Sequence, residues 1–104
     1  TAKCAGSFFM NPQVKDEKLC EEFAKDTGTA SKDGKLPAGW LIDHAGLRGK
    51  QIGKAKISDQ HPNYLLNTGG ATAEEVIMLA SLVKRKVRDE LGVQLREEVQ
   101  MVGF

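Results

Sequence analysis

The sequence predicts an α+β domain: a small, mostly antiparallel sheet with helices packed on one face, in the order β-α-α-β-β-α-β. Two observations carry this prediction. Apolar residues recur at helical spacing in three stretches, each flanked by capping or turn-forming residues. Around these stretches lie short apolar or alternating runs bounded by glycine, proline or asparagine, which is typical of strands. With 104 residues the chain has the length of one domain, residues 1–104.

The first half of the chain predicts one strand and two helices. Residues 5–10 form an apolar run that ends before Pro12, which cannot donate a hydrogen bond to a sheet. Residues 16–25 are predicted to form an amphipathic helix that packs on the sheet, with Asp16 near its start to bind free N–H groups. Residues 27–34 are rich in turn formers and predict a surface loop. A second helix is predicted from Pro37 to Ala45, because proline suits the first turn of a helix.

The second half predicts two strands, a long helix and a last strand. The strands lie near Gln51–Ser58 and Tyr64–Asn67, joined by a turn at 59–62. Thr72 and Glu75 have the spacing of a capping box, and Gly92 is placed to end the helix. One apolar stripe follows the cap at helical spacing: Val76, Leu79, Ala80, Val83 and Val87. Residues 93–102 alternate well enough for a final strand.

Composition excludes several classes of function. The 15 basic and 14 acidic residues give a net charge of +1, which argues against a general electrostatic grip on nucleic acid. No apolar run approaches the roughly 20 residues that cross a membrane. With only two cysteines, no disulfide framework can be read from their spacing, so we expect a cytoplasmic protein. The two cysteines and two histidines lack the close paired spacing of zinc ligands, and no metal site is predicted. The Gly69-Gly70 pair lacks the spacing of a phosphate-binding loop.

Four segments carry a resemblance to a known family. They are AGSFFMNP at 5–12, KLPAGWLID at 35–43, GLRGKQIG at 46–53 and LREEV at 95–99. In this order they resemble the AGSFFKNP, KLAAGWLID, LKGxxIGGA and LEPEV stretches of the C-terminal domain of UDP-N-acetylenolpyruvoylglucosamine reductases. One such segment is weak evidence. Four in the right order, with the capped helix between the third and fourth, are specific, and together they span nearly the whole chain.

The resemblance implies a reaction and two catalytic residues. Members of the family use FAD and NADPH to reduce UDP-N-acetylglucosamine enolpyruvate to UDP-N-acetylmuramate, a step of peptidoglycan precursor synthesis. Ser7 matches the serine that gives a proton to the reduced substrate. Glu98 matches the catalytic glutamate, although Glu97 replaces the usual proline, so the assignment between the two acids depends on the register with Val99. A flavin-binding domain is expected upstream, and this chain alone is expected to be inactive.

The resemblance also implies substrate-binding residues. Asn11 matches a substrate-contacting asparagine, Lys35 and Arg48 match basic positions, and His61 lies where the family carries glutamine or histidine. A diphosphate and a carboxylate call for cations, which agrees with these positions. Arg48 stands where lysine is usual, and Met10 replaces a lysine.

Other interpretations stay open on the residues alone. Ser7 would then be an ordinary strand serine, and Glu97, Glu98, Lys35 and Arg48 would be solvated charges. The chain could be a non-catalytic module that binds a nucleotide-sugar or a protein. A nucleic-acid-binding domain would need aromatic side chains on an exposed strand face. Phe8 and Phe9 would point to opposite faces of a strand, so at most one could serve.

Overall fold

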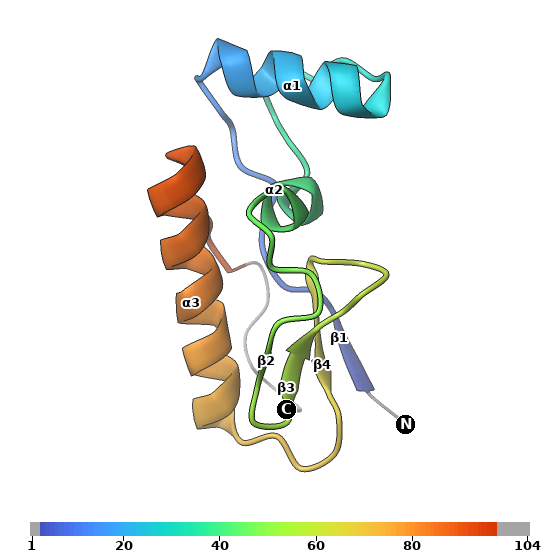
Figure 1. Ribbon diagram of the computed structural model, residues 1–104, viewed down its shortest axis with the longest axis vertical. Coiled ribbons are helices and arrows are strands. Elements are labelled where there is room, and N and C mark those ends of the chain that lie inside the picture. Colours follow the sequence, from blue (N-terminus) through green and yellow to red (C-terminus); the bar gives the residue numbers. More distant parts are fainter. Residues whose placement is uncertain (1–2, 98–104) are drawn as a thin grey trace.

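The computed structural model describes residues 3–97, with residues 3–7 described by their backbone alone. The molecule is elongated, with extents of 40 × 22 × 21 Å. In Figure 1 the sheet lies at one end and the first helix at the other. The elements are β1 (Lys3–Ser7), α1 (Glu17–Thr27), α2 (Ala38–His44), β2 (Gln51–Ile52), β3 (Ala55–Ile57), β4 (Tyr64–Asn67) and α3 (Ala73–Leu91).

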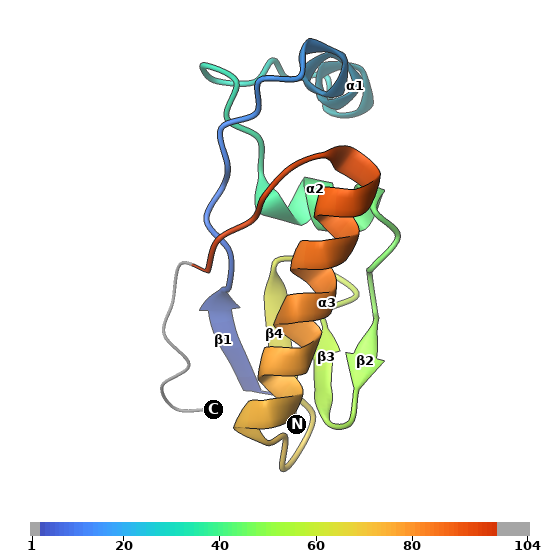
Figure 2. The same ribbon diagram turned by 90° about the vertical axis from the view of Figure 1, so that its left-hand side faces the viewer.

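The sheet has four strands in the order β1-β4-β3-β2, and every pair is antiparallel. The α+β class is therefore confirmed. Figure 2 shows α3 lying across one face of the sheet. The stripe predicted for this helix is its buried face, and it shares one core with the buried residues of β3 and β4: Ala55, Ile57 and Leu65.

The arrangement of the helices differs from the prediction. Only α3 covers the sheet face; α2 lies beyond the end of the sheet, and α1 lies beyond α2 (Figure 1). The apolar face of α1 packs on α2, where the rings of Phe23 and Trp40 meet edge to face at 5.3 Å. The expectation that α1 packs on the sheet was therefore wrong. An amphipathic pattern specifies that a helix buries one face but does not specify the partner.

The strand boundaries also differ in three places. The strand expected at 51–58 is a hairpin, because Gly53 has φ +57° and turns the chain between Ile52 and Ala55. The first strand spans Lys3–Ser7, not residues 5–10. Residues 93–97 form no strand and make one isolated bridge, between Glu97 and Phe9; the rest of the expected last strand, residues 98–102, lies outside the described residues.

The helix ends follow the predicted local chemistry. The carboxylate of Asp16 accepts hydrogen bonds from the N–H groups of Lys18 and Leu19. Thr72 and Glu75 form both halves of a capping box at the start of α3. Gly92 ends α3 in the left-handed conformation, with φ +70°. These three predictions are confirmed, and they depend on contacts within a few residues of each other.

Candidate functional site

Ser7 is the last residue of β1, at the point where the chain leaves the sheet. Its backbone lies opposite Tyr64 of β4, and the register of the two strands shifts between Cys4 and Ser7. A register shift of this kind bends a strand and changes the direction of the residues near it. The conformation at Ser7 therefore depends on what holds the chain directly after it.

The two residues after Ser7 are held by Asn63, which precedes β4. The N–H of Phe8 donates to the backbone carbonyl of Asn63 at 2.8 Å. The N–H of Phe9 donates to Asn63 Oδ1, and Asn63 Nδ2 donates to the carbonyl of Phe9, both at 2.9 Å. Both phenylalanines are buried and in contact, with ring centroids 5.0 Å apart. Neither ring is exposed for stacking on a base. These two residues therefore do not provide the exposed aromatic surface that a nucleic-acid-binding domain would need here.

The next contact brings in the chain that follows α3. Phe9 forms an antiparallel bridge with Glu97, and the N–H of Met10 donates to the carbonyl of Arg96 at 2.8 Å. The carboxylate of Glu97 forms an ion pair with Lys84 of α3 at 2.8 Å. The segment that leads toward Glu98 is thus paired with the segment that follows Ser7. Glu98 itself lies outside the described residues.

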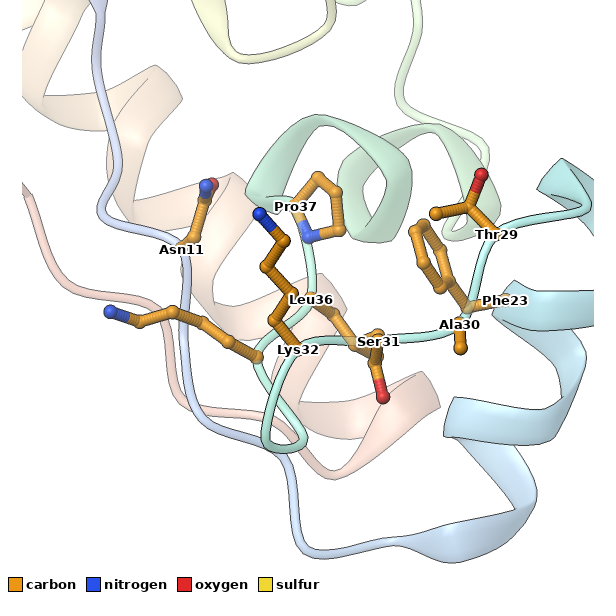
Figure 3. Close-up of a pocket in the computed structure, with 9 residues that line it drawn as sticks. Asn11, Phe23, Thr29, Ala30, Ser31, Lys32, Leu36 and Pro37 are labelled. Atoms are coloured by element: carbon orange, nitrogen blue, oxygen red, sulfur yellow. The ribbon is translucent and has the colours of Figure 1, made fainter.

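Asn11 connects this segment to α2 and to a surface hollow. Its Oδ1 accepts a hydrogen bond from the N–H of Ala38 at 2.9 Å. Because Pro37 supplies no side-chain cap to α2, Asn11 caps the helix from a distant part of the chain. Asn11 is exposed and shares with Lys32 and Lys35 the lining of a hollow of about 270 Å³ (Figure 3).

The hollow is built by the loop between α1 and α2. Figure 3 shows Phe23 at one side and Asn11 at the other, with Lys32 and Pro37 between them. The N–H of Lys35 donates to the carbonyl of Lys32 at 2.8 Å, which closes a tight turn at Asp33 and Gly34. This turn places two cations on one hollow. The family resemblance implied Lys35 but not Lys32, although the Asp-Gly pair between them is a strong turn signal.

A second hollow, of about 330 Å³, lies on the other side of Asn11. Its lining consists of Met10, Asn11, Pro12, Gln13, Gln94 and Arg96. Arg96 was not predicted as a site residue. It reaches this place because its backbone pairs with Met10, a contact between residues far apart in sequence. Asn11 thus lies between two hollows, each of which has at least one basic side chain in its lining.

Arg48 is tied within the domain. Its Nε donates to Asp43 Oδ1 at 2.9 Å, and an Nη atom donates to the backbone carbonyl of Asp59. The hydrogen bond from Arg48 lowers the pKa of the Asp43 carboxyl below its usual 3.8, against a smaller opposing effect of partial burial. The same bond raises the pKa of Arg48. Both side chains remain about half exposed.

His61 lies in the turn that Arg48 holds. Its N–H donates to Ser58 Oγ at 3.1 Å, and its exposed ring lies 5.3 Å from the ring of Tyr64. The predicted residues therefore fall into two groups. Asn11 and Lys35 line one hollow, whereas His61 lies in the turn before β4, Arg48 donates a hydrogen bond to that turn, and neither lines the hollow. Tyr64 connects the second group to Ser7, since Tyr64 and Ser7 lie opposite each other in the sheet.

The described residues offer no nucleotide-binding loop at the start of α3. Asn67 Oδ1 accepts from the N–H groups of Gly69 and Ala71, and the capping box uses the N–H groups of Thr72 and Glu75. These donors are therefore already bonded within the chain. Among residues 8–97, whose side chains the structure describes, there is no cluster of three metal-binding side chains. None of the described helices combines the length and apolarity needed to span a membrane.

The sequence and the fold have counterparts in known proteins. The family model for the C-terminal domain of UDP-N-acetylenolpyruvoylglucosamine reductase matches residues 1–102. The chain belongs to this family, as its four segments predicted. It is homologous to reductases that act as oxidoreductases in peptidoglycan precursor synthesis.

Individual relatives agree with this assignment. The chain is 46% identical over 101 residues to the UDP-N-acetylenolpyruvoylglucosamine reductase of Paracoccus denitrificans, covering 97% of this chain and 30% of the relative. It is 44% identical to the reductase of Photobacterium profundum, over 95% of this chain. The crystal structure of the reductase (MurB) from Thermus caldophilus matches with a TM-score of 0.60 and 34% identity, covering 94% of this chain and 27% of that one. The chain spans about 30% of the length of these curated relatives.

Proposed function

We propose that this chain is the substrate-binding and proton-donating domain of an FAD- and NADPH-dependent reductase. Its substrate would be UDP-N-acetylglucosamine enolpyruvate and its product UDP-N-acetylmuramate. The observation that carries the proposal is the pairing of the segment after Ser7 with the segment that leads to Glu98. Phe9 bridges Glu97, two residues from Ser7 and one from Glu98. The sequence match gives the identity of these residues, and the structure adds that the two segments are neighbours.

Ser7 is proposed as the proton donor. Reduction of the enolpyruvyl C=C bond needs a hydride at one carbon, which a flavin reduced by NADPH would supply, and a proton at the other. The carbon that awaits the proton carries the electron pair of the former double bond and is strongly basic. A serine hydroxyl is a weak acid in water, so it must be held close to that carbon. The hydrogen bonds at Phe8, Phe9 and Met10 support such a role, because they hold the chain directly after Ser7.

Glu98 is proposed as the catalytic acid in preference to its neighbour. The carboxylate of Glu97 is already paired with Lys84 at 2.8 Å. Adjacent residues of an extended chain point to opposite sides, so only one of the two acids faces a given site. The commitment of Glu97 to α3 therefore favours Glu98 for the reaction.

The anionic groups of the substrate are proposed to meet the cations around Asn11 and Arg48. Lys35 and the newly found Lys32 share a hollow with Asn11, and two ammonium groups there would favour a diphosphate. Arg48 uses Nε and one Nη atom within the domain, and the guanidinium is about half exposed beside the turn that contains His61, so its other N–H groups are proposed to bind the substrate. The N–H groups of Thr72 and Glu75 at the start of α3 are already bonded within the chain and are not available to the phosphates of FAD. We propose that an upstream flavin-binding domain, which the family resemblance implies, is the partner that holds FAD.

A domain exchange tests the proposal. In the Paracoccus denitrificans reductase, the 101 residues that match would be replaced by this chain. We expect the hybrid enzyme to oxidise NADPH when the enolpyruvate substrate is added. Ser7→Ala and Glu98→Gln should each lower kcat by roughly 10²-fold or more, the range of general acid–base catalysis. Glu97→Gln is the matched control and should leave kcat within about twofold, because that acid pairs with Lys84.

Two observations would contradict the proposal. The flavin absorbance of the hybrid and its bleaching by NADPH report whether the rest of the enzyme is intact. A hybrid that is bleached by NADPH but not reoxidised by the substrate would favour the alternative, a non-catalytic module that binds a nucleotide-sugar or a protein. Full activity in the Ser7→Ala variant would remove the proton-donating role.

A further inference from the structure

The side chain of Asn63 acts on the backbone of Phe9 as a neighbouring strand would. Its amide accepts from the N–H and donates to the carbonyl of Phe9, both at 2.9 Å. A primary amide presents one acceptor and two donors in a plane, so it can pair with both groups of one peptide residue. Phe9 is fully buried, and its backbone groups therefore depend on Asn63 for these two hydrogen bonds.

These two hydrogen bonds between Asn63 and Phe9 form a clamp. The clamp lies directly after the end of β1, where the chain is no longer paired in the sheet. β1 ends at Ser7, and Phe8 and Phe9 continue beside Asn63, which directly precedes the residue opposite Ser7, Tyr64. The backbone carbonyl of Asn63 also accepts from the N–H of Phe8. Three hydrogen bonds from one residue thus replace the strand pairing that stops after Ser7.

Neighbouring elements hold Asn63 in turn. Pro62, which precedes it, is buried, and its ring restricts the chain that enters β4. On the other side, Gly39 of α2 packs closely, since a Cβ placed there would lie 3.6 Å from Asn63 Cβ. Asn63 is therefore enclosed between α2 and the segment that follows Ser7. A side chain enclosed in this way keeps one conformation, which a positioning role requires.

We infer that Asn63 is a positioning residue that fixes the backbone at Ser7 and thereby orients the proton donor. This inference rests on the proposed function of Ser7. The register shift between Cys4 and Ser7 means that the regular sheet does not by itself set the direction of Ser7. A displacement of about 1 Å in a reacting group can lower a rate by roughly 10²-fold, so loss of the clamp should act on catalysis as well as on folding.

Asn67, at the other end of β4, provides a matched control. It is also half-buried, and its side chain also makes two hydrogen bonds to backbone groups, the N–H groups of Gly69 and Ala71. Asn67→Ala therefore removes the same number of side-chain bonds from the same strand, away from Ser7. Amide hydrogen exchange on this chain is the first measurement. We expect faster exchange at Phe9, with altered NMR shifts at Ser7, in Asn63→Ala but not in Asn67→Ala.

Steady-state kinetics of the hybrid enzyme are the second measurement, with activity scaled to the flavin that NADPH bleaches. Asn63→Ala should lower kcat by about 10- to 100-fold with KM changed less than about threefold. The solvent deuterium isotope effect on kcat should rise, because proton delivery becomes slower than the other steps. Loss of folded enzyme would lower activity without changing that isotope effect. Asn63→Asp keeps an acceptor and loses the donor. Its kcat should therefore lie between that of the parent hybrid enzyme and that of Asn63→Ala.

The outcomes separate this inference from the proposal on which it rests. In one outcome Ser7→Ala is impaired, while Asn63→Ala behaves like Asn67→Ala in both hydrogen exchange and isotope effect. The positioning role of Asn63 is then wrong, and the proposed role of Ser7 as proton donor is retained. If Ser7→Ala is fully active, the proposed function fails, whatever Asn63 does. Unchanged exchange at Phe9 in Asn63→Ala would overturn the clamp itself, with no reference to activity.

Discussion

The two ends of β4 are each secured by an asparagine, and the two asparagines work over different ranges. Asn67 bonds to the N–H groups of Gly69 and Ala71, two and four residues away. Asn63 bonds to Phe9, which is 54 residues away in the sequence. The same type of side chain thus closes a local turn at one end of the strand, through Asn67, and joins two distant segments at the other end, through Asn63.

The difference matters because the two ends have different tasks. The Asn67 end leads into α3, and it has additional ties: the N–H of Thr68 donates to the carbonyl of Lys54 at 2.8 Å, and the N–H of Lys54 donates to Glu75. The Asn63 end faces Ser7, and its two side-chain bonds go to one buried residue. We conclude that the Asn63 end depends on a few long-range side-chain bonds to one residue, whereas the Asn67 end is held by several bonds, local and longer-range, that involve different residues.

The largest expected effect tests this contrast through stability. Asn63→Ala leaves the N–H and C=O of fully buried Phe9 without partners, and we expect a loss of roughly 2–4 kcal/mol in the free energy of unfolding. Asn67→Ala should cost about 1 kcal/mol, because the N–H of exposed Gly69 can bond to water. Urea denaturation of the two variants measures both values. Equal losses would mean that the two ends are equivalent, and the contrast drawn here would be wrong.

The same contrast explains how much of the fold could be predicted. Features that depend on near neighbours in sequence were predicted: the caps at Asp16 and Thr72, the buried stripe of α3, and the stop at Gly92. Features that depend on distant partners were not. Nothing local in the sequence shows that α1 packs on Trp40 rather than on the sheet, or that Asn63 meets Phe9.

The residues of the candidate site show the same difference between features that can be predicted from the sequence and features that depend on distant partners. The family resemblance named Asn11 and Lys35, and the structure places both at one hollow. Lys32 could have been found from its turn, whereas Arg96 reaches its hollow through a backbone bond to Met10, far away in sequence. The resemblance could not reveal that Arg48 is tied to Asp43 and Asp59, because a motif gives residue identity without the contacts that the fold imposes.

A second, smaller effect is expected at the turn beside the Asn67 end. A Cβ on Gly53 would lie 1.8 Å from Glu75 Oε2, and the φ of +57° already disfavours any other residue. Gly53→Ala should therefore displace Glu75 from the capping box and destabilise the chain by about 2 kcal/mol. Gly92→Ala is the control: its φ is also positive, +70°, but nothing lies within 4 Å of the added carbon, so only the backbone strain of about 1 kcal/mol remains. Thermal unfolding of both variants would measure the difference, and identical losses would show that Glu75 moves aside without consequence.

The smallest effect concerns the ion pair that supports the Asn63 end. Arg48 joins Asp43, at the end of α2, to the carbonyl of Asp59, in the turn that precedes Asn63. The hydrogen bond lowers the pKa of Asp43 in the folded chain below its usual 3.8, so this carboxylate contributes stability at neutral pH, and the contribution is lost as the pH falls through the lowered value. Asp43→Asn should therefore be slightly less stable than the parent chain at pH 7, and equal to it once the pH has fallen below the lowered pKa of Asp43.

The size of that difference is limited because both side chains are about half exposed and water screens the pair. Urea denaturation over a pH series that starts at 7 and continues well below 3.8, each at low and high salt, measures it. A difference that persists at low pH would show that Asp43 acts through packing rather than charge. A difference that vanishes with added salt at pH 7 would instead mean that the charge is largely solvated, and that the Asn63 end depends on the bonds of Asn63 itself rather than on the pair behind it.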